Sequence, residues 1–170
     1  VRDAIDKAEQ IVFNLGDEQM TDTLQKLHDL TGTVTEILEE RYEAKQEITG
    51  VPTGYYELDR LLAGLQPGTL NIVGARPAMG KSAFALGMAV NVAKKTGRPV
   101  LFFSLEMGAT ELTQRIISAE AQVESDRLRT GNLTDSDWSK IVNAVGRLDI
   151  PLYIDDTSQI TVMQIRQKLR

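Results

Sequence analysis

The chain has 170 residues, 42% of them hydrophobic and 25% charged, which is ordinary for one globular domain with a sizeable core. It has no cysteine and a single histidine, which excludes disulfides, thiolate metal sites and histidine-rich metal sites and fits a reducing, cytoplasmic location. No apolar run reaches the roughly 18 residues of a membrane-spanning helix and no leader pattern is evident, so we expect neither a membrane span nor a secretion signal.

The net charge of −5 is unevenly distributed along the chain. Residues 1–47 carry 12 acids and 5 bases, a net of −7, whereas residues 48–170 carry 12 acids and 14 bases, a net of +2. Neither part is basic enough to indicate nucleic-acid binding from composition alone. The sequence begins with Val1 and ends at Arg170 within a helical pattern, so we expect a fragment of a longer protein.

The acidic segment contains two helical patterns. Residues 2–15 predict a short helix, and residues 21–47 predict a second, amphipathic one. Gly32 interrupts the second pattern, and Thr33 followed by Glu36 matches a capping box that would begin a new helix there. A lone amphipathic helix cannot bury its apolar stripe, so we expect it to dock on its own domain or on a neighbouring copy. The stripe comprises Leu24, Leu27, Leu30, Val34, Ile37 and Leu38.

A turn-rich joint at residues 48–54 marks the start of the main domain. After it, alternating apolar patterns predict a short helix near Tyr56, a buried strand at 70–73, and a helix over 81–95 that is apolar nearly all round. Farther along, the same patterns predict a strand at 100–103, helices at about 110–121 and 134–147, a strand at 152–154 and a helix from 160. Short, uniformly apolar strands that alternate with helices predict an α/β fold, with a parallel sheet and helices on both faces.

The helix at 134–147 carries the most detailed local signal. Thr134 and Asp137 match a capping box at its start. We expect its core face to comprise Trp138, Ile141, Val142 and Val145.

The loop after the first predicted strand matches a phosphate-binding pattern. Residues 75–82 read Ala-Arg-Pro-Ala-Met-Gly-Lys-Ser, which satisfies the phosphate-loop pattern when alanine is allowed first. Gly80 lets the backbone approach the phosphates, Lys81 supplies positive charge for the β and γ phosphates, and the Ser82 hydroxyl can ligate Mg²⁺. The alternative, an incidental turn with a solvated lysine, is disfavoured by the apolar strand before the loop and the buried helix after it. We therefore expect ATP and Mg²⁺ to be bound by Ala75, Arg76, Pro77, Ala78, Met79, Gly80, Lys81, Ser82 and Ala83.

Two acidic positions follow predicted strands, at the sheet edge where parallel α/β proteins hold ligands. Glu106 follows the 100–103 strand, where it could orient or deprotonate the water that attacks the γ-phosphate. The alternative is a solvated loop glutamate or the acid of a helix cap. Asp155 ends the 152–154 strand and could be an aspartate that helps to hold Mg²⁺. The alternative is that Asp155 and Asp156 simply cap the turn before Thr157.

Similarity to a known family extends over essentially the whole chain from residue 48, in residues 48–54, 57–59, 74–84, 103–107, 128–131 and 153–157. Together these segments resemble the DnaB family of bacterial replicative DNA helicases. The resemblance implies a RecA-like P-loop NTPase core, present here in part, in a homo-hexameric ring. It also implies ATP-driven translocation on single-stranded DNA with 5′→3′ unwinding, and a primase and a helicase loader as partners.

The resemblance also divides the chain. Residues 1–19 would be the end of an N-terminal helical domain, residues 20–47 a linker helix that docks on the adjacent subunit, and residues 48–170 the first part of the ATPase domain. It implies catalytic roles for Lys81 and Glu106 and a magnesium role for Ser82. It argues against Asp155 as the magnesium aspartate, which in this family lies on a later strand.

That strand, the DNA-binding loops and the arginine finger would follow Arg170. We therefore expect the 170-residue piece to bind nucleotide weakly and neither to hydrolyse ATP nor to unwind DNA by itself. Two other interpretations stay open: a RecA-like ATPase of recombination or clock type, and an assembly module whose main act is docking the 21–47 helix. A P-loop kinase is less favoured because no acceptor-binding or lid segment is evident.

Overall fold

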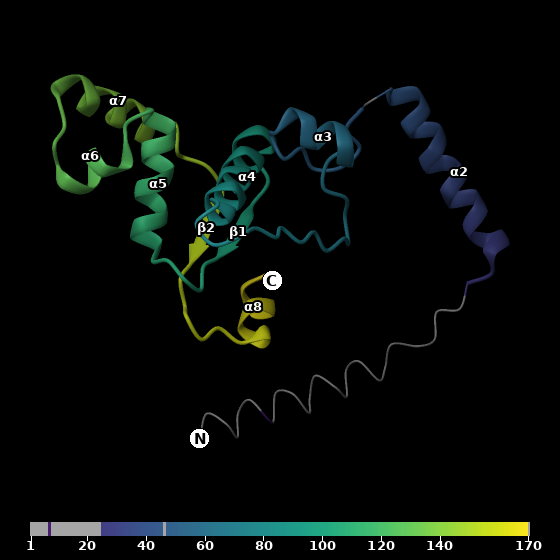
Figure 1. Ribbon diagram of the computed structural model, residues 1–170. Coiled ribbons are helices and arrows are strands. Elements are labelled where there is room, and N and C mark those ends of the chain that lie inside the picture. Colours follow the sequence, from purple (N-terminus) through teal and green to yellow (C-terminus); the bar gives the residue numbers. More distant parts are fainter. Residues whose placement is uncertain (1–6, 8–24, 46, 170) are drawn as a thin grey trace. The chain divides into compact units, whose positions relative to one another are not determined.

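The computed structural model describes residues 7, 25–45 and 47–169, and the chain divides into two compact units, Val1–Gln46 and Glu47–Arg170 (Figure 1). The helix predicted at residues 2–15, and with it the segment assigned to an N-terminal domain, lies outside the described residues apart from residue 7.

The first unit contains the helix α2 (Leu27–Ala44), which runs through Gly32 without a break. The new helix predicted at Thr33 is therefore wrong. A single glycine costs a helix only about 1 kcal/mol, and the hydroxyls of Thr31 and Thr35 bond to carbonyls of the preceding turn at 2.7 and 2.8 Å without disturbing its course. None of the residues of α2 is buried, and its apolar stripe is exposed, at Leu27, Leu30, Val34, Ile37 and Leu38.

The second unit begins with a joint that one buried carboxylate holds together. Asp59, in α3 (Tyr56–Leu62), accepts hydrogen bonds from the backbone N–H and the hydroxyl of Thr53, at 2.6 and 2.7 Å, and from the N–H of Gly54 at 3.1 Å. Asp59 is only 4% exposed and Thr53 is fully buried. Asp59, a buried carboxylate within α3, thus holds the turn at Thr53 and Gly54 by hydrogen bonds rather than by apolar packing.

The joint also packs against α4 (Lys81–Thr96), the helix that follows the phosphate loop. The ring of Tyr55 stacks on that of Phe84 with centroids 4.9 Å apart. Gly54 and Gly87 have no room for a Cβ, which would come within 2.6 Å of Asn91 and 2.5 Å of Tyr55 respectively. The predicted boundary segment is therefore a tightly fitted part of the second unit.

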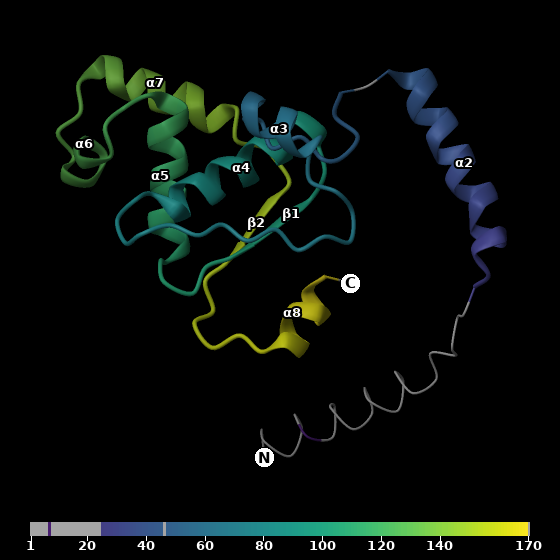
Figure 2. The ribbon, with the colours of Figure 1, turned by 45° about the vertical axis from the view of Figure 1, so that its right-hand side comes forward.

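The sheet consists of β1 (Val100–Phe103) and β2 (Leu152–Asp155), paired in parallel with Val100 opposite Leu152. Figures 1 and 2 show the two strands side by side with α4 lying along them. The strands predicted at 100–103 and 152–154 are therefore confirmed. Because side chains alternate along a strand, one face of the pair is directed toward α4 and α5 (Ala109–Ala121). The core on this face has Leu86, Leu112 and Ile116 buried, with Val90, Phe102, Met107, Leu148, Leu152 and Ile154 packed against them.

The strand predicted at residues 70–73 is not formed. Leu70 and Ile72 are 86% and 84% exposed, and the stretch has no regular secondary structure. A strand is held by ladder hydrogen bonds to a neighbour, and within the described residues β1 and β2 pair only with each other. The apolar run thus remains part of the coil between α3 and α4 that is visible in Figure 2.

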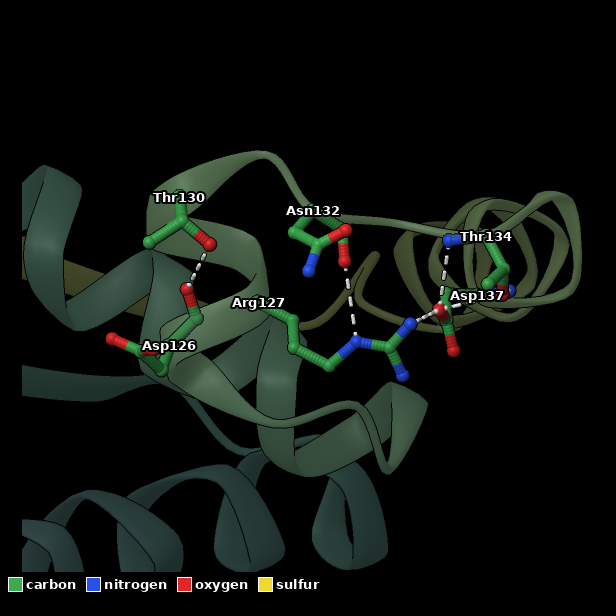
Figure 3. A network of polar contacts seen from close by, with 6 residues as sticks. All are labelled: Asp126, Arg127, Thr130, Asn132, Thr134 and Asp137. Carbon is green, nitrogen blue, oxygen red and sulfur yellow. Dashed lines mark hydrogen bonds and ion pairs between the residues drawn. The ribbon is translucent and has the colours of Figure 1, made fainter.

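A second small core lies among α5, α6 (Ser125–Thr130) and α7 (Asp135–Gly146). The capping box predicted for α7 is confirmed, because Thr134 and Asp137 each accept the other's backbone N–H. Arg127 donates to the same Asp137 carboxylate at 2.5 Å and to the carbonyl of Asn132 at 3.2 Å, which ties α6 to the start of α7 (Figure 3). The core comprises Ala121, Val123, Ile141 and Ala144, with Ile117, Leu128 and Leu133 around them.

The core face of α7 differs from the prediction at three of four positions. Ile141 is buried as predicted, whereas Trp138, Val142 and Val145 are 61%, 56% and 52% exposed. The stripe that faces inward lies one residue earlier, at Asp137, Ile141 and Ala144. The capping box and the ion pair with Arg127 hold Asp137 inward, and this fixes the rotation of the whole helix.

The last described helix, α8 (Val162–Lys168), begins with its own capping box between Thr161 and Gln164. Lys168, in its last turn, forms an ion pair with Asp155 at the end of β2. Over the described part of the chain, every helix is too short or too polar to cross a membrane.

Candidate functional site

The predicted phosphate loop is an exposed segment that leads directly into α4. Gly80 is the N-cap of that helix with φ 80° and ψ 19°, in the left-handed region that glycine adopts without strain. Ala78 has φ 62°, which costs a residue with a Cβ about 1–2 kcal/mol. The N–H of Phe84 bonds to the carbonyl of Gly80 at 2.9 Å, so regular helix begins at once. Backbone strain of this kind concentrates at ligand-binding loops.

Among the described helices, α4 is the one whose first turn has neither a side-chain cap nor an acidic residue. By contrast, α7 and α8 begin with complete capping boxes. The first N–H groups of a helix have no acceptor within it, and the helix dipole makes this end positive. A Cβ added at Gly80 would meet nothing within 4 Å, so the space beside the turn is open. An anion such as a phosphate fits these features.

Lys81 and Ser82 lie in this turn. Lys81 is exposed, and in the described part of the chain no carboxylate pairs with it, so its ammonium group can neutralise an anion. Ser82 is half-buried beside it. The described residues contain no group of three His, Asp or Glu side chains that could hold a metal ion by themselves. A hydroxyl beside a phosphate site suits Mg²⁺, which keeps several waters and binds through phosphates and few protein ligands.

Glu106 lies in a tight turn directly after β1. Ser104, 7% exposed, donates its hydroxyl to the carbonyl of Met107 at 2.7 Å and accepts the N–H of Met107 at 3.3 Å. The N–H of Ser104 donates to the carbonyl of Asp155 at 2.8 Å, which extends the β1–β2 pairing into the turn. The turn is thus closed from within and attached to the sheet, while the Glu106 side chain is exposed.

Asp155 uses both carboxylate oxygens within the protein. One accepts the N–H of Thr157 at 3.0 Å, which is the turn-capping contact, and the other pairs with the Lys168 ammonium group. The hydrogen bond from Lys168, followed by those from Thr157, lowers the pKa of Asp155 to about 2. A carboxylate already neutralised by a lysine suits an anchor for α8 better than a magnesium ligand.

The fold brings the predicted residues to one end of the sheet. Figures 1 and 2 show α4 beginning at the end of the sheet where β1 and β2 finish, so the loop at 75–83 and the turn with Glu106 belong to the same end. Sequence reasoning missed Ser104, whose signal was a hydroxyl residue directly after a buried strand. It considered Asp156 only as a cap of the turn before Thr157, whereas the Asp156 carboxylate accepts the N–H of Ala109 at 2.8 Å.

Comparison with known proteins gives a consistent set of relatives. The family model described as DnaB-like helicase C terminal domain matches residues 50–170. The chain is 44% identical to the replicative DNA helicase DnaC of Bacillus subtilis (strain 168), over the whole chain and 38% of that protein. It is 41% identical to the replicative DNA helicase DnaB of Geobacillus stearothermophilus, over 98% of the chain and 37% of that protein. The chain therefore spans well under half the length of the curated relatives it matches.

Two solved structures share the fold. The first, described as an ATPase domain, has a TM-score of 0.77 and 32% identity over 83% of this chain and 50% of that one. The second, a DnaB-like replicative helicase described with its interactions with primase, has a TM-score of 0.74 and 30% identity over 98% of this chain and 43% of that one.

Proposed function

The chain belongs to the DnaB-like helicase C-terminal domain family, and from this we propose that it is part of a longer replicative helicase that hydrolyses ATP to unwind DNA in the 5′→3′ direction. The family resemblance inferred from the sequence is confirmed, and so is its RecA-like α/β fold. We assign residues 48–170 to the first part of the ATPase domain and residues 20–47 to its linker. The two relatives compared above are both described as replicative DNA helicases, which favours this function over a recombination-type ATPase.

The observation that carries the proposal is the uncapped, acid-free first turn of α4 behind a left-handed Gly80. Residues 75–83 would hold the triphosphate, with backbone N–H groups on the phosphate oxygens and the Lys81 ammonium group against the β and γ phosphates. The Ser82 hydroxyl would hold Mg²⁺. When bound, that ion draws charge away from the phosphate oxygens.

Glu106 would act on the water that attacks the γ-phosphorus. In that step the water oxygen bonds to phosphorus, the bond to the β–γ bridging oxygen breaks, and the carboxylate of Glu106 accepts the proton of the water. The Ser104 bonds to Met107 fix the backbone on both sides of Glu106. An exposed carboxylate on a rigid turn can meet a water held at the end of the sheet.

The assembly is part of the proposal. The exposed apolar stripe of α2 supports its docking on a neighbouring copy in a hexameric ring. We also propose single-stranded DNA as the substrate track, a primase and a helicase loader as partners, and a cytoplasmic location. A primase is part of the description of one similar structure. Comparing the assembly size of the full-length protein with and without residues 1–47 tests the docking role by itself.

Two substitutions in the full-length protein test the enzyme. Lys81→Ala should remove ATP turnover and weaken nucleotide binding, and Lys140→Ala, at an exposed lysine of α7, is its control. Glu106→Gln should bind nucleotide normally and lose hydrolysis, with Glu111→Gln, at an exposed glutamate of α5, as its control. Normal hydrolysis by Glu106→Gln would show that its assigned role is wrong. Ring-dependent ATPase activity from the 170-residue piece alone would count against the division proposed here.

A further inference from the structure

Asp156 joins two elements that are far apart in sequence. It lies one residue past β2, and its Oδ2 accepts the backbone N–H of Ala109, the first residue of α5, 47 positions earlier, at 2.8 Å. The N-cap of α5 is Gly108, which has no side chain to offer its own helix. Asp156 therefore supplies from β2 the acceptor that α7 and α8 obtain from a threonine of their own. Its negative charge also suits the positive end of α5.

This contact holds the second end of the segment 104–109, which carries Glu106. At its start, Ser104 bonds to the carbonyl of Asp155 through its N–H and to Met107 through its hydroxyl. At its end, three residues after Glu106, Ala109 bonds to Asp156. Both attachments to the sheet therefore come from two consecutive residues at the end of β2. Because the Glu106 side chain is exposed, the backbone of this segment determines where its carboxylate lies.

The two consecutive acids have separate tasks. The carboxylate of Asp155 is engaged by Thr157 and by Lys168 of α8, whereas that of Asp156 turns to α5. We propose that Asp156 is a positioning residue for ATP hydrolysis, which holds the start of α5 and through it the turn that presents Glu106 to the attacking water. This inference rests on the proposed function, in which Glu106 is the catalytic carboxylate.

Asp156→Ala in the full-length protein removes the acceptor. A displaced catalytic group costs rate steeply, so kcat for ATP should fall about tenfold while KM stays within about twofold, because the phosphate loop is untouched. Amide hydrogen exchange of residues 104–112 should become faster, while exchange across α7 stays unchanged and shows that the fold persists. Asp156→Asn keeps an acceptor oxygen and should retain most of kcat. Asp149→Ala is the matched control, because Asp149 is exposed and its side chain has no hydrogen bond or ion pair with the described residues.

Ala109→Pro tests the same bond from its other side. Proline is well tolerated at the first position of a helix and has no N–H to donate. Gly108 precedes it with φ −69° and ψ 153°, the conformation that a residue before proline prefers. Ala109→Pro should therefore lower kcat as Asp156→Ala does. The double variant should be no slower than either single one, because both remove one interaction.

Four results would overturn the inference: unchanged exchange at 104–112 in Asp156→Ala, unchanged kcat, additive losses in the double variant, or an Asp156→Asn as impaired as Asp156→Ala. The last would mean that the charge itself is used, as in a direct contact with metal or nucleotide. Failure of the proposed function is seen separately, as normal turnover in Glu106→Gln. If Glu106→Gln is inactive and any of the four results above is found, the positioning role of Asp156 is wrong while the proposed function stands.

Discussion

Replacing Asp59 with alanine should unfold the joint that precedes the phosphate loop. The carboxylate is 4% exposed and accepts three hydrogen bonds, two from Thr53 and one from Gly54. A hydrogen bond to a charged group contributes about 1.5–3 kcal/mol. The three donors share one carboxylate and water can enter the vacated space, so we expect a loss of about 3–5 kcal/mol rather than the full sum.

Asp59→Asn separates the hydrogen bonds from the charge. Its amide oxygen can still accept from Thr53, but its NH₂ group would face the N–H of Gly54, so we expect a smaller loss of about 1–3 kcal/mol. Urea unfolding followed by circular dichroism measures both variants. With a slope of about 2 kcal/mol per molar urea, Asp59→Ala should lower the midpoint by about 2 M. A shift no larger than that of the control Asp149→Ala would refute the role of this carboxylate.

The pH dependence of unfolding gives an independent check on Asp59. Burial raises the pKa of Asp59, but the hydrogen bonds from Thr53 and Gly54 outweigh it and lower the pKa below 3.8. Because the folded-state pKa lies below the unfolded one, the carboxylate stabilises the fold above about pH 4, and this contribution is lost as the pH falls through the folded-state value. Asp59→Asn should lack this part of the acid destabilisation.

Three further substitutions address other parts of the structure. Gly80→Val places a branched side chain at a left-handed position beside the first turn of α4, so calorimetry should show nucleotide affinity at least about tenfold weaker, whereas stability falls by only about 1–2 kcal/mol; equal affinity would contradict a phosphate site there. Thr134→Ala removes half of the α7 capping box and should cost about 1 kcal/mol, or about 3 °C in the melting temperature; an unchanged melting temperature would show that the box contributes nothing. Lys168→Met should raise the pKa of Asp155 from about 2 toward its ordinary value of 3.8 in an NMR titration of the carboxyl carbon. In the wild type, by contrast, the ion pair of Asp155 with Lys168 stabilises the fold above about pH 4, and this contribution is lost as the pH falls toward 2.

Several signals that act within a few residues were read correctly from the sequence, although the capping-box pattern at Thr33 and Glu36 was misleading because α2 runs through it without a break. The start of α4 follows from the phosphate-loop pattern, and the start of α7 from two side chains three residues apart, Thr134 and Asp137. The strands at 100–103 and 152–155 are short apolar runs that pair with each other in parallel. The run at 70–73 has the same composition but no partner within the described residues, and composition alone cannot distinguish the two cases.

What the sequence left open depends on contacts between distant residues. Trp138 and Asp137 begin two adjacent stripes of the same helical period, and the contacts of Asp137 with Thr134 and with the distant Arg127 hold the Asp137 stripe inward. The short helix α6 was not predicted, because its six residues are too few for a periodic pattern. The capping of α5 by Asp156 spans 47 residues and has no local signature.

Isothermal titration calorimetry of the full-length protein with ATP and Mg²⁺ tests most directly whether the first turn of α4 binds phosphate. We predict saturable binding at one site per chain in the wild type and in Lys140→Ala, and at least about tenfold weaker binding in Lys81→Ala. A wild-type protein that gives no binding heat, or a Lys81→Ala variant with unchanged affinity, would contradict the assignment of residues 75–83 as the nucleotide site.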